Sequence, residues 1–399
     1  MSESEDEDLC SVIPPEGLRM AMVAMAGTVI ALVSVIFNAF LFFILISNSQ
    51  YRRTHLLFLA FLALIDTFLS ASYIMIFPVN LFMDYFESEF LAWAWFNYVK
   101  PMLAICHVAI TSSALLLTAA TFERFLTISK IRNQFSTTIR LFIVSVTVIF
   151  AVAAKAPMYF ELIVVENPNC TGVTGYSAYM AEWSNEEPYQ TVYKFWFRNI
   201  VGTFLPFFLS LHFNIRIVAR LRQQHTGARL FRFATSEHRR NIRAATRMLV
   251  LITSTYIVCN SLSVVIAAWE FIDKESLYTS QLRPFYTYAT DLVSILTVVA
   301  CSIRLPIYYF CNRRLRREVN ETLLRFCGCE PEKIEGFSRK SRLTTIRYLN
   351  TGDGFVLCNN ENRRNEPKFV VGTGFDRVVL QVAMQDFNRA NGMCNAAHI

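Results

Sequence analysis

Residues 302–319 read SIRLPIYYFCNRRLRREV, and this segment indicates the kind of fold to expect. It closes a long apolar run, places Arg304 and Pro306 near the end of that run, and then turns abruptly into cations. An apolar run that stops at a cluster of arginines is typical of a helix leaving a lipid bilayer, because charged side chains stay at the level of the headgroups. The segment therefore raises the question of how many such helices the chain contains.

The composition is too apolar for a soluble chain of this length. Of 399 residues, 54% are hydrophobic, 14% aromatic and 17% charged. A helix needs roughly 20 apolar residues to cross a bilayer, and seven runs are long enough: Met20–Asn48, Leu56–Met83, Pro101–Phe122, Leu141–Phe160, Asn199–Ile215, Met248–Trp269 and Pro284–Ile303. The fifth is short, but Phe195–Phe197 lengthen it with interfacial aromatic residues. The sequence predicts an all-α membrane protein, a seven-transmembrane helix bundle, rather than the buried helices of a soluble fold.

Basic and acidic residues separate between alternate loops. Arginines and lysines fill the segments after the first, third, fifth and seventh runs, whereas carboxylates fill the amino terminus and the other loops. By the positive-inside rule, this pattern predicts an extracellular amino terminus and a cytoplasmic carboxyl terminus in the plasma membrane. The first residues are acidic, unlike a cleavable signal peptide, so we expect the first helix to act as its own insertion signal. The net charge is +7, and the basic residues lie where anionic inner-leaflet lipids and cytosolic partners would meet them. The charge therefore does not indicate binding to nucleic acid.

We expect three parts along the chain: an extracellular segment at residues 1–19, a membrane domain at residues 20–328, and a cytoplasmic, largely disordered tail at residues 329–399. The membrane domain should end in a basic amphipathic helix, Asn312–Phe326, lying on the inner leaflet. Cys327 and Cys329 follow that helix, and they are either palmitoylated or ordinary cytosolic thiols.

Cys10 and Cys170 are the cysteines that this topology places outside the cell. They either form a disulfide between the amino terminus and the second outer loop or stay apart, since sequence alone does not show whether their geometry permits the bond. Asn169 begins an Asn-Cys-Thr glycosylation sequon on the same face. In the tail, Ser338 opens a cluster of serines and threonines among basic residues that kinases can phosphorylate.

Charged residues in the hydrocarbon are costly and are therefore candidates for function. Those within the predicted spans or directly at their ends are Asp66, Glu123, Arg124, Lys155, Asp291 and Arg304, and the polar Asn38 is available to Asp66. Lys155 lies near the outer end of the fourth run, where we expect its ammonium group to reach the headgroups. Arg304 has two possible partners, Asp66 or the inner headgroups, and we favour the headgroups.

Several of these residues resemble landmarks of the rhodopsin-like (class A) G-protein-coupled receptors. The landmarks are Asn38, Leu62-Ala-Leu-Ile-Asp66, Glu123-Arg124-Phe125, Pro206 and Leu305-Pro-Ile-Tyr-Tyr309, in the family's order and spacing over residues 20–328. The resemblance implies a receptor that binds an extracellular ligand and activates heterotrimeric G proteins, with arrestin and kinases as further partners at the tail. It implies neither enzymatic activity nor a cofactor, and the sequence shows no nucleophile–base pair, metal cluster or phosphate loop.

The resemblance also implies roles. Pro306 would loosen the seventh helix, because proline removes a backbone hydrogen bond, and Tyr309 would swing inward on activation. Arg124 would pair with Glu123 at rest and face the G protein in the active state. In this family an acid at the start of the sixth helix often holds the arginine, but residues 241–247 offer only neutral residues and arginines. We therefore expect this lock to be absent and basal activity to be raised.

Other family landmarks are missing. Val99 stands where the third helix usually begins with a disulfide-bonded cysteine, and Cys106 lies two turns deeper. The sixth helix reads Cys259-Asn-Ser-Leu262 in place of Cys-Trp-x-Pro, and Leu305 replaces the asparagine of the seventh-helix switch. The fold is expected to be kept, whereas the family's usual activation relay is not expected to operate unchanged.

Within the family, four segments are similar to invertebrate, especially nematode, receptors for FMRFamide-type neuropeptides: Tyr193–Asn199, Arg247–Val250, Tyr256–Asn260 and Arg304–Tyr308. A retinal protein would need a lysine within Leu292–Cys301, and an amine receptor would present an aspartate in place of Cys106. The resemblance therefore favours a peptide ligand.

The predicted outer loops are rich in carboxylates, and acidic clefts concentrate cationic ligands. We expect Glu270 and Asp291 to bind the guanidinium of a peptide that ends in arginine and an amidated aromatic residue. The peptide's rings would meet four aromatic side chains with cation–π contacts in addition: Trp196, Trp269, Tyr286 and Tyr288. Each of these residues has an alternative role in an interfacial aromatic belt or as a solvated carboxylate.

Two rival functions remain open. One is a chemosensory receptor of the same fold that takes a small environmental molecule. The other is a seven-helix transporter or channel, in which Asp66, Arg304 and Lys155 would line the path.

Overall fold

The computed structural model describes residues 10, 12, 14–129, 131, 135–230, 237–273, 276–277, 279, 281–326, 347–351 and 354–358. The chain divides into two units, Met1–Leu323 and Leu324–Ile399. The second unit contains an antiparallel hairpin of β3 (Arg347–Thr351) and β4 (Gly354–Cys358). Cys327, Cys329 and the Ser338 cluster lie outside the described residues, as does most of the predicted disordered tail.

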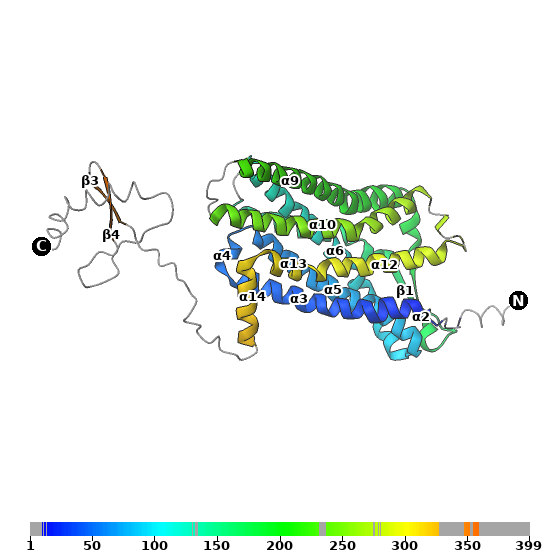
Figure 1. The fold of residues 1–399 in the computed structure, drawn as a ribbon. Helices are drawn as coiled ribbons and strands as arrows, with labels where there is room; N and C mark the ends of the chain where they lie inside the picture. Colours follow the sequence, from blue (N-terminus) through cyan, green and yellow to red (C-terminus); the bar gives the residue numbers. More distant parts are fainter. Residues whose placement is uncertain are drawn as a thin grey trace. The chain divides into compact units, whose positions relative to one another are not determined.

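Within the described residues of the first unit, seven helical spans are long and apolar enough to cross a membrane. Their elements are α2 (Gly17–Arg19), η1 (Met20–Gly27) and α3 (Thr28–Ser47); α5 (Leu56–Phe86); α6 (Glu89–Ile128); α7 (Thr137–Lys155) and α8 (Met158–Glu161); η4 (Tyr189–Phe204) and α9 (Leu205–Leu230); α10 (Glu237–Ile272); and α12 (Arg283–Ser302) and α13 (Arg304–Cys311). The spans lie side by side in one bundle (Figure 1). Six of the seven predicted runs lie within these spans and the first exceeds its span by one residue, Asn48, so the predicted bundle is confirmed.

The two ends of the bundle carry different elements (Figure 1). One end carries α2 and β1 (Leu162–Glu166), and the other carries α4 (Ser49–Arg52) and α14 (Arg313–Phe326). We refer to them as the β1 end and the α14 end.

The third span begins earlier than predicted. α6 starts at Glu89, although the apolar run starts only at Pro101. Ser88 caps the helix by accepting a hydrogen bond from the Leu91 amide at 3.4 Å. Glu89 then places a carboxylate in the first turn, where the helix dipole favours negative charge. Polar residues such as Asn97 interrupt the hydropathy run, but they do not interrupt the helix.

The seventh span is interrupted between α12 and α13. Ile303, which separates them, has φ −73° and ψ −14°, short of ordinary α-helical geometry. Pro306 explains the interruption, because it has no N–H to donate to the Ser302 carbonyl one turn earlier and its ring crowds that carbonyl. The break in this helix therefore lies three residues before the proline.

The main apolar core lies toward the α14 end. Fully buried side chains from the first, second, third, sixth and seventh spans pack together there, among them Leu41, Leu59, Leu116, Ile252 and Tyr308. Leu315 and Val319 of α14 join the same cluster, while all five arginines of this helix are exposed. This two-sided character confirms the predicted amphipathic eighth helix.

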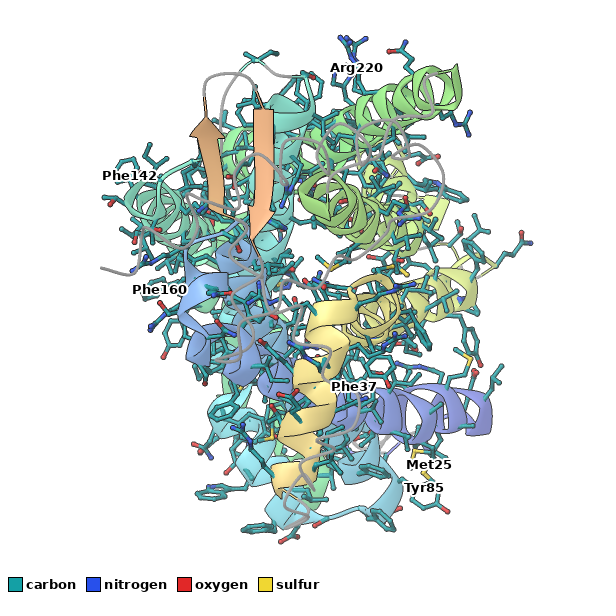
Figure 2. All side chains as sticks on the ribbon, turned by 60° about the vertical axis from the view of Figure 1, so that its left-hand side comes forward. Met25, Phe37, Tyr85, Phe142, Phe160 and Arg220 are labelled. Carbon is teal, nitrogen blue, oxygen red and sulfur yellow. A yellow bond between two sulfur atoms is a disulfide. The ribbon has the colours of Figure 1, made fainter. Side chains whose placement is uncertain are left out.

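Large apolar side chains also cover the outside of the bundle. Phe142 and Phe160 of the fourth span and Met25 of the first project outward (Figure 2). Contiguous apolar surface of this kind is unfavourable in water but suits contact with lipid acyl chains. The arrangement is what a membrane-spanning bundle requires.

A β-hairpin follows the fourth span. β1 pairs antiparallel with β2 (Tyr176–Met180), with Leu162 opposite Met180 and Glu166 opposite Tyr176. Its turn contains the short 3-10 helix η2 (Gly172–Gly175), and a second one, η3 (Glu182–Asn185), follows β2. Gly172 has φ +73°, a conformation that favours glycine.

Candidate functional site

A buried ion pair lies beside the interruption of the seventh span. Arg304 of α13 donates from Nη1 to Oδ2 of Asp66 on α5, 238 residues away in the sequence. Ser113 of α6 donates to Asp66 Oδ1 at 3.0 Å and accepts from Arg304 Nη2 at 3.3 Å. The side chains of Arg304 and Asp66 are 4% and 0% exposed. The prediction that Arg304 reaches the headgroups is wrong, because Asp66 and Ser113 hold its guanidinium inside the bundle.

Asn38 connects the first span to the same region. Its Nδ2 donates to the Ser34 carbonyl at 2.9 Å and to the Cys301 carbonyl at 3.2 Å. Cys301 lies in the last turn of α12, next to the break. The landmarks Asn38 and Asp66 and the predicted intramembrane charge Arg304 are thus brought together around the weak point of the seventh helix.

At the α14 end, Glu123 is paired with a residue that sequence reasoning counted only as a loop cation. Arg140 of α7 donates to Glu123 Oε1 at 2.6 Å and to Oε2 at 3.2 Å, and the Phe135 amide donates to Oε1 at 3.0 Å. Arg140 also donates to the Arg53 carbonyl at 3.0 Å. The predicted resting pair of Glu123 with Arg124 is therefore wrong, because Arg140 takes both carboxylate oxygens.

Arg124 is buried but has no salt bridge within the described part of the chain, and its Nε has no hydrogen-bond partner there. His55, in the turn before α5, is buried near it, and both of its ring nitrogens lack partners among the described residues. Burial and the positive charges of Arg124 and Arg140 hold the pKa of His55 well below its ordinary value. The imidazole is therefore neutral, and Arg124 lies close to the charge of Glu123 without forming a salt bridge to it.

Hydroxyl and amide contacts join the third, fifth and sixth spans near Arg124. Thr121 and Thr253 lie 3.2 Å apart through their hydroxyl oxygens, and Thr118 and Ser210 lie 2.8 Å apart. Asn214 donates to Ser254 at 2.9 Å. The side chains of residues 241–245, where the family's acidic lock was predicted to be absent, are outside the described set. Uncharged contacts therefore link these helices where the sequence suggested no link.

Two tyrosines follow Pro306 and differ in burial. Tyr308 is fully buried, and its hydroxyl has no partner among the described residues. Tyr309, the residue that matches the family's switch, is half-buried against the core and contacts Phe310 edge to face. Sequence reasoning had singled out Tyr309 alone.

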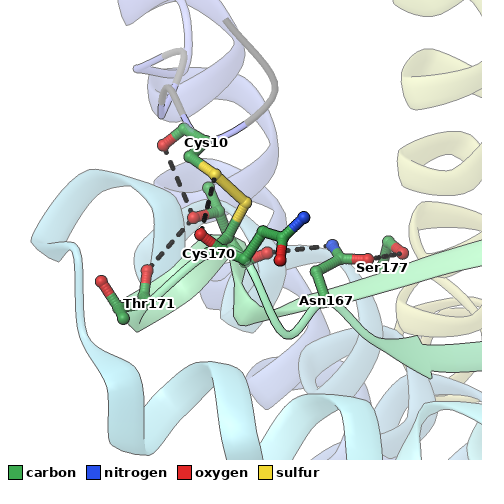
Figure 3. The surroundings of a disulfide bond; sticks show 7 residues. Cys10, Asn167, Cys170, Thr171 and Ser177 are labelled. Carbon is green, nitrogen blue, oxygen red and sulfur yellow. Dashed lines mark hydrogen bonds between the residues drawn. A yellow bond between two sulfur atoms is a disulfide. The ribbon is translucent and has the colours of Figure 1, made fainter. Parts of the chain in front are cut away.

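At the β1 end, Cys10 and Cys170 are joined by a disulfide across 160 residues (Figure 3). Thr174 donates to the Cys10 carbonyl at 3.5 Å, and Asn167 donates to the Thr174 carbonyl at 3.0 Å. Asn169, which carries the glycosylation sequon, is exposed next to the disulfide. The amino-terminal segment is thus attached to the loop between the fourth and fifth spans.

The amino-terminal segment also contacts two predicted ligand residues. Arg19 donates from Nε to Asp291 Oδ2 at 2.7 Å and from Nη2 to Oδ1 at 3.4 Å. One turn away, the Tyr288 hydroxyl donates to Glu16. The sequence suggested that Asp291 is a free carboxylate. In the structure it already binds the guanidinium of Arg19 in its own chain.

The other predicted ligand residues form a second group. The Tyr286 hydroxyl donates to Glu270, and Trp269 Nε1 donates to the Ser276 hydroxyl at 2.9 Å. Trp196 stands apart from them, because its side chain is 57% exposed on the outside of η4. Five of the six predicted residues thus lie at the β1 ends of the sixth and seventh spans, whereas Trp196 has the exposure of an interfacial residue.

Lys155 is also placed differently from its prediction. It is only 5% exposed, so its ammonium group does not reach the headgroups. Near it, Arg198 forms a salt bridge with Glu161 at 2.8 Å. This buried charge cluster had no signal in the sequence beyond the presence of Lys155.

The family is decided by comparison with known proteins. A family model described as 7 transmembrane receptor (rhodopsin family) matches residues 37–309, more than half of the chain. The chain belongs to this family. As a rhodopsin-family receptor, it is a G-protein-coupled receptor that responds to an extracellular ligand, and this family of receptors is generally not enzymatic.

The receptor also resembles a solved structure. The crystal structure of squid rhodopsin matches with a TM-score of 0.58 and 14% identity, over 80% of this chain and 85% of that chain. At this identity the likeness concerns the fold alone. No match to the receptor is found among curated protein sequences.

Sequence reasoning missed the partners of the receptor's charged residues. Arg140 was counted only as a basic loop residue, Arg19 was not singled out, and Ser113 lies among ordinary small residues of the third span. The signal that could have found Arg140 is helical spacing, because Arg140, Val144 and Thr147 share the buried face of α7.

Proposed function

We propose that the receptor is activated by an extracellular peptide of the FMRFamide type, which carries an arginine followed by an amidated aromatic residue. The observation that carries the proposal is the guanidinium of Arg19 on Asp291 at 2.7 Å, beside the hydroxyl of Tyr288. A carboxylate that binds a guanidinium of its own chain through two donors suits the arginine of a peptide. The segment similarities to FMRFamide-type receptors support the same ligand.

The proposal places the β1 end outside the cell in the plasma membrane, in agreement with the distribution of basic loops. Asn169 is then available for glycosylation, and the disulfide lies in an oxidising environment, where such bonds persist. The α14 end, with its exposed arginines, faces the cytoplasm and the heterotrimeric G protein.

The peptide arginine must exchange with Arg19. The side chain of Arg19 is 30% exposed, so its pair with Asp291 is only partly desolvated and its net strength is ~1 kcal/mol or less. A ligand that adds contacts to Glu270, Trp269 and Tyr286 offsets this cost.

Activation follows from preferential binding to one of two states. Binding at Asp291 acts on α12, which ends at the break beside the Asp66–Arg304 pair. Rearrangement of α13 and the neighbouring spans then exposes Arg124, whose guanidinium is not committed to Glu123, to the G protein.

The test is G-protein activation in transfected cells by amidated Arg-Phe peptides, each compared with its free acid. Removing the Asp291 charge with Asp291→Asn should reduce potency about tenfold to a hundredfold, the value of a charged hydrogen bond. Arg19→Gln removes the resident competitor and should raise potency up to about fivefold. Glu166→Gln, an exposed carboxylate of β1, is the matched control and should leave potency unchanged.

Arg124→Ala should abolish the response while leaving peptide binding measurable. A silent panel on receptor shown to be at the cell surface would refute the peptide assignment. Activation by small environmental molecules under the same conditions would then identify a chemosensory receptor.

A further inference from the structure

Lys155 faces the inside of the bundle. The buried positions of α7 recur every three or four residues, at Val144, Thr147, Ala151 and Lys155, whereas Phe142 and Ile149 face outward. A lysine on the buried stripe of a membrane helix is costly, and such residues normally have a partner inside the protein.

The partner that the chain offers is already occupied. Glu161 of α8 accepts from Arg198 Nη1 at 2.9 Å on Oε1 and at 2.8 Å on Oε2, and Oε1 also accepts from the Tyr189 hydroxyl at 2.7 Å. Among the described residues, Lys155 Nζ forms no hydrogen bond and no salt bridge, although the charge of Glu161 acts on it through space. The carboxylate of Glu161 is therefore near Lys155, but it is bonded to Arg198 and Tyr189 and not to Lys155.

The charges around Lys155 leave a positive excess. Lys155 and Arg198 carry two positive charges, and Glu161 carries one negative charge. His107 of α6 lies within electrostatic reach of both cations, and its imidazole carries an N–H that can donate a hydrogen bond. A buried charge without a counter-ion is unfavourable by several kcal/mol, so a group that supplies a negative charge here is stabilised.

The backbone of η4 approaches the ammonium group at a glycine. Gly202 is the buried residue of η4, and a Cβ placed on it would lie 3.7 Å from Lys155 Nζ and 3.8 Å from its Cε. Glycine at this position leaves open the space that a side chain would take up next to the ammonium.

We propose that Lys155, with Arg198 and His107 around it, is a binding site for a carboxylate of the extracellular ligand. Lys155 Nζ donates to the carboxylate, and the excess positive charge of the cluster is neutralised on binding. This site deepens the proposed function, on which it rests for the identity of the ligand: the peptide carries an acidic side chain in addition to its arginine. An amidated carboxyl terminus has no charge, so the acidic group comes from an aspartate or glutamate.

The first test does not depend on the peptide. Purified full-length receptor in detergent is unfolded thermally with phenylacetate, a carboxylate probe, or with phenylacetamide, its neutral counterpart. At several times its dissociation constant, phenylacetate should raise the melting temperature by at least about 2 °C, and phenylacetamide should not. The shift should disappear in Lys155→Met and persist in Lys155→Arg, which keeps the charge.

Lys100→Met is the matched control, because Lys100 stacks on the Tyr159 ring rather than facing this cluster. It should retain the full shift. An equal shift in wild type and Lys155→Met, or no shift in wild type, overturns the proposal.

The second test links the site to the peptide. Two amidated Arg-Phe peptides that differ only by aspartate or asparagine are compared on wild type and on Lys155→Glu. Wild type should favour the aspartate peptide at least about tenfold, and Lys155→Glu should lose that preference. A silent peptide panel together with a phenylacetate shift rejects the peptide assignment and keeps the carboxylate site. Equal responses to both peptides together with no shift reject the site and keep the peptide.

Discussion

The Asp66–Arg304 pair predicts an asymmetric response to mutation. Both side chains are almost fully buried, and Ser113 contacts both of them. Asp66→Asn leaves a guanidinium that cannot lose its proton and has no anion, so the variant should be destabilised by about 3–5 kcal/mol. Arg304→Met leaves a carboxylate, which can take up a proton, so this variant should be destabilised less.

The double variant Asp66→Asn/Arg304→Met distinguishes this explanation from simple loss of packing. It contains no unpaired charge, and replacing a buried ion pair by uncharged groups is often close to neutral. It should therefore be more stable than Asp66→Asn alone, with a coupling energy of ~2 kcal/mol or more.

The assay is thermal unfolding of purified receptor in detergent, with surface expression as a second readout. Asp66→Asn should lower the apparent melting temperature by on the order of 10 °C. Thr67→Val is the matched control, because its hydroxyl donates only to the Ala63 carbonyl of its own helix at 2.9 Å. Single-variant effects that simply add in the double variant, or an Asp66→Asn cost below ~1 kcal/mol, would show that the pair does not carry the predicted energy.

Three further predictions concern other contacts. Arg140→Gln frees Glu123, which can then pair with the adjacent guanidinium of Arg124. Basal G-protein activation, measured in membranes, should therefore fall about fivefold. An increase would show that Arg140 instead restrains the resting state. Thr253→Val removes the hydroxyl contact between the third and sixth spans, and basal activation should rise a few-fold, corresponding to ~1 kcal/mol; an unchanged nucleotide-exchange rate would contradict this. Replacing both cysteines of the disulfide by serine should destabilise the β1 end by about 2–5 kcal/mol, measured as faster proteolysis of the amino-terminal segment, and protection equal to wild type would count against it.

Much of the architecture follows from local sequence. Each predicted run lies inside an observed span, apart from Asn48 at the end of the first run, because bilayer thickness sets the minimum number of consecutive apolar residues. Pro306 predicted the weak point of the seventh helix, since the lost hydrogen bond lies within one turn of the proline. The eighth helix was likewise readable, because Leu315 and Val319 recur at helical spacing between arginines. These features depend on residues at most a few positions apart.

The charged site was less predictable. Asp66, Arg124, Asp291 and Arg304 were correctly singled out as unusual residues in apolar runs, but their surroundings were not. Arg304 was expected at the headgroups, and Asp291 was expected to be free. A charged residue within an apolar run can be recognised from the sequence as energetically unfavourable. The residue that pairs with it cannot be recognised in the same way, because it lies elsewhere in the chain.

The set of spans, the family landmarks and the positions of the buried charges can therefore be read from the amino-acid sequence. The pairing of Arg304 with Asp66 across 238 residues, and of Arg19 with Asp291 across 272, becomes visible in the folded chain alone. The folded chain also shows that Lys155 faces the interior without a salt bridge to any described residue. The physical reason is that Coulomb energy depends on separation in space and on local desolvation. Both are set by how the helices rotate and pack against one another, and hydropathy along the chain does not contain that information.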